Sequence, residues 1–162
     1  MRNLLIGFCA LLLSASLFPQ VVSAQTRQDA LRALQALQSR CESGLNYDMF
    51  ETALDEAQTG LSRFFDFQES EKNPEFTEKA ERALVAYQTA FILWKGKVTY
   101  RQDFISYGHP TAKMLVDVYP EVADQFDSTG QARVSDLVKF FWDKADERIA
   151  EAKKLVSAKS KR

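Results

Sequence analysis

Few side chains in this sequence could support catalysis or metal binding. His109 is the only histidine, and it stands before Pro110 in a Gly-His-Pro break. A b-type haem would have to pair His109 with Met49 or Met114, and covalent haem attachment is excluded because there is no C-x-x-C-H sequence. We predict that His109 is a turn residue and that the protein holds no cofactor or metal, with ligation by His109 as the alternative.

A cysteine is the next candidate. The chain has two, Cys9 and Cys41, and Cys9 lies in an N-terminal export segment. A mature chain would keep Cys41 alone, which rules out an intrachain disulfide. Cys41 follows Leu34 and Leu37 at helical spacing, so the pattern predicts a buried, apolar thiol. A reactive thiol and a disulfide-linked dimer through Cys41 are the alternatives, and no partner base for nucleophilic catalysis is identifiable.

Three carboxylates are spaced as they would be on one face of a helix. Asp143, Glu147 and Glu151 recur every four residues, with Lys144 and Arg148 between them. Alternating charges at this spacing are typical of a solvated, ion-paired face rather than of a metal site. Because no titratable residues converge by pattern, we predict a protein that is not an enzyme.

Residues 1–24 have the pattern of a cleaved secretory signal peptide. Arg2 precedes an apolar run over residues 4–18, and Val22-Ser23-Ala24 resembles a small-residue cleavage site. The run is too short to read as a membrane span, so we expect a periplasmic or secreted protein with no transmembrane segment. Losing Arg2 changes the formal net charge from −1 to −2, and nucleic acid is therefore not an expected partner.

The remaining chain contains four long stretches of apolar residues at helical spacing. They predict helices near residues 27–43, 47–67, 74–106 and 131–157. Thr26, Asn46 and Asn73 are suitable N-cap residues for the first three. The third stretch is apolar on most sides around Trp94, so we expect it to be the central helix with Trp94 in the core.

A shorter segment, Thr111 to Phe126, keeps helical spacing on both sides of Pro120. We predict that it forms a short helical cap over one end of the long helices. No stretch has the alternating pattern of a strand, so we expect an all-α protein, an antiparallel four-helix bundle with that cap between its third and fourth long helices. The bundle would occupy residues 25–157, followed by a flexible basic tail at 158–162.

Some aromatic residues of the predicted helices are adjacent in sequence, so they cannot all face one core. Others lie in the segment between the third and fourth long helices. We expect the third and fourth helices to outrun the first two, which would leave apolar surface near the short segment. Exposed aromatic clusters often mark binding sites. Either the Thr111–Phe126 segment and the links cover these side chains, or the side chains form a partner or ligand surface. The candidate residues for such a surface are Tyr107, Met114, Tyr119, Phe126, Phe140 and Trp142.

The N-terminal half has one family resemblance. A secretory signal, a leucine-rich first helix, the junction Ser43-Gly44-Leu45-Asn46-Tyr47, Phe50 and a second helix centred on Ala57 together resemble small uncharacterised secreted helical proteins of bacteria. The resemblance implies no activity. The functional hypothesis is a non-enzymatic exported binding module that acts on a protein or envelope partner. The alternative is a periplasmic carrier of a small apolar ligand or b-type haem in the bundle core or under the cap.

Overall fold

A computed structural model describes residues 26–66 and 68–159. The predicted signal peptide and the last three residues of the predicted tail lie outside these ranges. Helices account for most of the described residues, and a two-stranded sheet is the other regular element. No helix within these ranges is long and apolar enough to cross a membrane. The elements are α1 (Arg27–Glu42), α2 (Tyr47–Phe65), α3 (Gln68–Glu71), α4 (Pro74–Tyr100), β1 (Phe104–Ser106), α5 (Pro110–Val118), η1 (Pro120–Gln125), β2 (Gln131–Arg133) and α6 (Val134–Lys159).

The predicted starts of the first three long helices are confirmed. The Thr26 hydroxyl accepts a hydrogen bond from the Asp29 amide at 3.3 Å, and the Asp29 carboxylate accepts one from the Thr26 amide at 3.1 Å, which completes a capping box. The Asn46 side chain accepts from the Met49 amide at 2.9 Å. α4 begins at Pro74. Proline is suited to this position because the first amide of a helix has no hydrogen-bond partner within the helix.

Two predicted helix boundaries are wrong: the end of the third long helix and the start of the fourth. α4 runs without a break through Gly96 but ends at Tyr100 instead of residue 106, because Arg101 takes a left-handed conformation with φ of 54°. The chain then forms β1, which pairs antiparallel with β2, with Ile105 opposite Ala132. Each strand has only three residues with a single buried one, which is too short for the alternating pattern to be visible in the sequence. α6 consequently begins at Val134 and not at residue 131.

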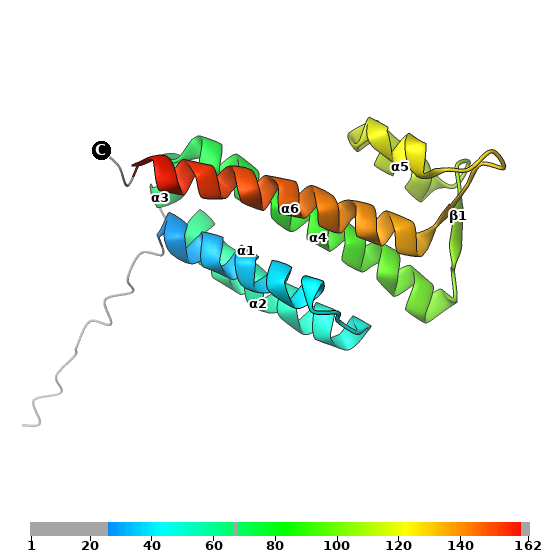
Figure 1. Ribbon diagram of the computed structural model, residues 1–162, viewed down its shortest axis with the longest axis horizontal. Helices are drawn as coiled ribbons and strands as arrows, with labels where there is room; N and C mark the ends of the chain where they lie inside the picture. Colours follow the sequence, from blue (N-terminus) through cyan, green and yellow to red (C-terminus); the bar gives the residue numbers. More distant parts are fainter. Residues whose placement is uncertain (1–25, 67, 160–162) are drawn as a thin grey trace, which may run out of the picture.

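The long helices pack in two pairs. α4 and α6 lie side by side, α1 packs on α2, and both α1 and α2 also contact α4 (Figure 1). One continuous apolar core joins them. Its largest fully buried side chains come from all four helices, among them Leu34, Phe50, Phe64, Tyr87 and Phe141.

The centre of the core lies closer to the N-terminus of α4 than expected. Tyr87 is completely buried, whereas Trp94 is only half-buried and Ile92 is 64% exposed. Trp94 therefore packs against the core at its edge and is not one of its fully buried residues. The cause is that the last two turns of α4 have fewer neighbours: Val98 is also more than half exposed.

The segment between the long helices does not lie across their ends. α5 and η1 lie along the flank of α6, where Tyr119 packs on Phe141 with ring centroids 5.1 Å apart (Figure 1). An ion pair of 3.2 Å between Glu121 and Lys144 joins η1 to the same helix. The predicted cap is thus a side cover, because Tyr119 and Val122 bring apolar surface to α6.

α1 and α2 approach closely at a glycine. A Cβ added at Gly60 of α2 would lie 3.0 Å from the Cβ of Ala33 on α1, closer than such atoms normally come. Gly96 of α4 differs, since the nearest atom to an added Cβ would be the flexible end of Gln102, at 3.4 Å. Only the first glycine is required by packing.

This difference predicts opposite effects of filling the two positions. We expect Gly60→Leu to lower the free energy of unfolding by about 1–3 kcal/mol because α1 must move away. Gly96→Ala should raise it by about 0.5–1 kcal/mol, because alanine favours the helix and meets only a movable side chain. Urea denaturation followed by circular dichroism measures both. A Gly60→Leu protein as stable as the wild type would contradict the close approach.

Candidate functional site

A cavity of about 470 Å³ lies where α1 ends against α4 and α6. We call it the Trp94–Trp142 cavity. The last turn of α1 forms one wall, the C-terminal half of α4 a second, and the N-terminal half of α6 the third. Its lining residues are Cys41, Glu42, Trp94, Lys97, Ser135, Val138, Lys139, Trp142, Asp143 and Asp146.

The apolar wall is aromatic. The Trp94 and Trp142 rings meet edge to face, with centroids 5.7 Å apart, and Phe50 of α2 packs on Trp142 at 5.5 Å. These are the two tryptophans of the chain. The Trp142 indole N–H is shielded from solvent and has no hydrogen-bond partner among the described residues. The rings are therefore held by contact with one another and with Phe50, which leaves the cavity with a preformed wall.

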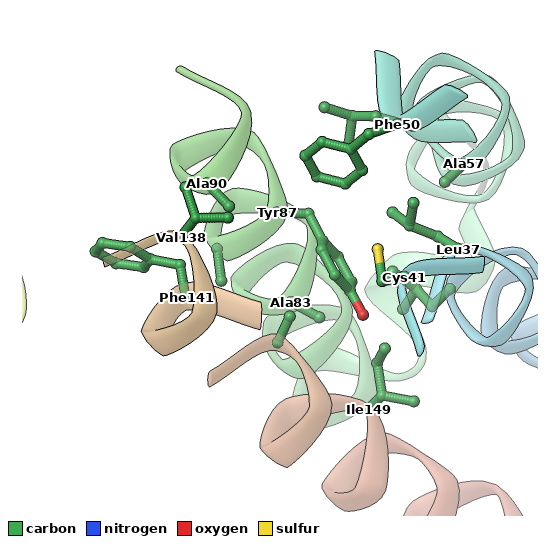
Figure 2. Packing of buried hydrophobic residues seen from close by; sticks show 14 of the residues in the cluster. Leu37, Cys41, Phe50, Ala57, Ala83, Tyr87, Ala90, Val138, Phe141 and Ile149 are labelled. Carbon is green, nitrogen blue, oxygen red and sulfur yellow. The ribbon is translucent and has the colours of Figure 1, made fainter. Parts of the chain in front are cut away.

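A hydrogen bond between two helices forms the polar floor. The buried Tyr87 hydroxyl of α4 donates to the Asp146 carboxylate of α6 at 2.9 Å, and the Gln38 side chain of α1 bonds the same carboxyl. Figure 2 shows the Tyr87 ring extending from α4 toward Cys41 and Ile149. Burial raises the pKa of Asp146 above its ordinary value, although the two hydrogen bonds act in the opposite direction.

Cys41 is a buried thiol, as predicted. It is 8% exposed, and burial, with a smaller contribution from the Asp146 and Glu42 charges, raises the pKa of this thiol to about 12. The thiol is therefore protonated at neutral pH, and the protonated form is a poor nucleophile and metal ligand. In this site Cys41 supplies apolar surface.

The charges around the cavity do not cancel. Lys139 pairs with Asp143 at 2.7 Å, and Lys97 pairs with Asp103 at 3.5 Å. Asp146 and Glu42 have no basic partner within 4.0 Å in the described part of the chain. The lining thus carries two carboxylates without an ion-pair partner among the described residues, Asp146 partly buried and Glu42 exposed.

The residues of the predicted surface lie in different places. Trp142 lines the cavity, while Phe140 packs on Phe141, on the flank that Tyr119 covers. Tyr107 and Phe126 form a separate pair with ring centroids 5.2 Å apart.

Met114, the last member of that surface, is 56% exposed on α5. His109 caps the same helix, with its Nδ1 accepting from the Thr111 amide at 3.2 Å. The acidic row on α6 is ion-paired, since Asp143 meets Lys139 and Glu151 meets Arg148 at 3.0 Å. No group of three His, Cys, Asp or Glu side chains in the described ranges could hold a metal ion.

Sequence reasoning missed the polar floor of the cavity. Neither Tyr87 nor Asp146 is among the residues that the sequence patterns single out as candidate site residues. The sequence does contain a pattern that indicates this contact: Trp142, Asp146 and Ile149 recur at positions i, i+4 and i+7 of one helix, so Asp146 lies in an apolar stripe. A carboxylate in an apolar stripe is a candidate for a buried polar contact.

The environment of Asp146 predicts a pH-dependent effect on stability. Its pKa is higher in the folded protein than in the unfolded chain, so its ionisation lowers stability as the pH rises above the ordinary aspartate value of about 3.9. We expect Asp146→Asn, which keeps an acceptor for Tyr87, to raise the midpoint of urea unfolding at neutral pH. The gain should disappear at a pH below that ordinary value.

Glu147→Gln is the matched control on α6, because the Glu147 carboxylate is exposed and pairs with Lys144 at 3.2 Å. It should not reproduce the gain. A lower midpoint for Asp146→Asn at neutral pH, or a gain that is equal at both pH values, would contradict the assignment.

Comparison with protein-family models, with curated protein sequences and with solved structures found no match for this chain. The residues of the Trp94–Trp142 cavity are therefore the basis for inferring function.

Proposed function

We propose that this protein is an exported, non-enzymatic binding protein of the bacterial envelope. Its four long helices would act as an antiparallel bundle that holds the Trp94–Trp142 cavity open for a small, largely apolar ligand. The observation that carries the proposal is the cavity itself, which contains both tryptophans of the chain. Its volume of about 470 Å³ is within the usual range for small-molecule sites, roughly 300–1,000 Å³.

The chemistry of the lining favours binding over catalysis. Burial raises the pKa of Tyr87 and of Cys41, so both keep their protons at neutral pH. Asp146 is tied to the Tyr87 hydroxyl at 2.9 Å. Nucleophilic catalysis needs a nucleophile activated by a neighbouring base, and this set supplies a protonated thiol and a neutral phenol instead.

The same lining favours an organic ligand over haem. The chain's only histidine, His109, caps α5 and is not part of the cavity. No methionine lines it either, and the Cys41 thiol is protonated at neutral pH. Haem iron is usually held by histidine, methionine or a cysteine thiolate.

A second candidate function is a module that binds a protein partner of the envelope. It rests on apolar side chains at the surface of the connecting segment. Phe104, Tyr107, Met114 and Val118 are each about half exposed or more. This candidate would use the outer side of β1 and α5 and leave the cavity empty.

Filling the cavity should separate the two candidates. Val138 lines the cavity and is almost fully buried, so Val138→Trp should place an indole where the ligand would bind. We expect native mass spectrometry of wild-type protein purified from its own host to show a bound small mass. Val138→Trp protein should lack that mass and give the mass of the polypeptide alone.

Val85→Trp is the matched control, because Val85 is exposed on α4 and makes no part of the cavity wall. It should retain the small mass. A wild-type protein without a bound mass, or a Val138→Trp protein that keeps it, would contradict the proposal. The protein-binding candidate would then be the better account.

A further inference from the structure

The ligand class can be narrowed by the charges of the cavity, and this step rests on the binding function proposed above. We infer that the Trp94–Trp142 cavity selects a small cationic amphiphile, an ammonium group attached to an apolar or aromatic body. Its body would lie against the two indoles, and its ammonium group would face the carboxylates of Asp146 and Glu42.

The first support is the uneven pairing of charges. The two lysines of the lining already have carboxylate partners, Lys139 with Asp143 at 2.7 Å and Lys97 with Asp103 at 3.5 Å. Asp146 and Glu42 have none among the described residues, although both line the cavity. An anionic ligand would meet two uncompensated negative charges, whereas a cation would neutralise them.

The second support is the desolvation of Asp146. Its carboxylate is partly buried and has the Tyr87 hydroxyl and the Gln38 side chain as hydrogen-bond partners, both uncharged groups. A partly buried charge without a counter-ion destabilises the protein. A ligand cation would supply the missing counter-ion and form a charge-assisted hydrogen bond.

The third support is the aromatic wall. The two indoles offer a large apolar surface on which the body of the ligand can pack, and the carboxylates of Asp146 and Glu42 belong to the same lining. The unpaired Trp142 N–H does not argue for an anion, because it is shielded from solvent by the protein.

Three probes of nearly equal size test the inference: phenethylamine, phenethyl alcohol and phenylacetate. They share a phenyl ring and differ in the charge of the head group. Both tryptophans of the chain line the cavity, so intrinsic fluorescence reports on this site. We expect phenethylamine to bind at neutral pH with a Kd of roughly 1 mM or tighter, and about tenfold more tightly than the alcohol. Phenylacetate should bind most weakly.

Two variants assign the selectivity to the carboxylates. Asp146→Asn should weaken phenethylamine binding about tenfold and change the affinity for phenethyl alcohol much less. Glu42→Gln should act in the same direction, and Glu147→Gln on the exposed side of α6 should change neither affinity. Retained binding of the alcohol by Asp146→Asn also verifies that this variant keeps the cavity.

The outcomes separate this inference from the proposed function. Equal binding of the amine and the alcohol, or tighter binding of phenylacetate, would overturn the cation selectivity and leave the apolar cavity as a binding site. An amine preference that persists in both Asp146→Asn and Glu42→Gln would also overturn it. Binding of none of the three probes at millimolar concentration would overturn both proposals.

Discussion

The position of the Trp94–Trp142 cavity depends on a difference in length among the four long helices. α1 and α2 have 16 and 19 residues, whereas α4 and α6 have 27 and 26. At 1.5 Å per residue, the longer helices extend at least about 10 Å beyond the shorter ones. Because apolar surface is covered only where helices lie opposite each other, the side of α4 and α6 that α1 covers becomes open beyond the end of α1. The cavity lies at that point, between the last turn of α1 and the continuing walls of α4 and α6. Val134 and Leu137, near the start of α6, stay buried against other elements.

The connecting segment covers a different part of the long helices. η1 and Tyr119 pack on Phe141, whereas Trp142 and Asp146 face α1 and the cavity. Successive residues of one helix point in different directions, so α6 can be covered on one flank and open on another. The Tyr87–Asp146 hydrogen bond links α4 to α6 at the floor of the open side.

Helical spacing predicted most of the fold. The caps at Thr26 and Asn46 and the predominantly helical content follow from local preferences that act within a few residues. The strands were missed because their pairing joins residues 104–106 to 131–133, and three residues are too few to reveal an alternation. The half-buried position of Trp94 depends on where α1 stops relative to α4, which is a property of packing and not of the α4 sequence. The Asp146 contact was likewise hidden, because a charged residue between apolar ones reads as solvent-facing until its partner is known.

The central claim, that a ligand occupies the Trp94–Trp142 cavity, can be tested directly by NMR. The chain has two tryptophans, so a ¹⁵N-labelled sample gives two indole N–H signals, and both belong to the cavity wall. Titration with phenethylamine should shift both signals with one common binding constant. It should leave the backbone amides of Tyr107, Met114 and Phe126 unchanged. Shifts confined to those amides, with both indole signals unmoved, would contradict the account and locate binding on the connecting segment.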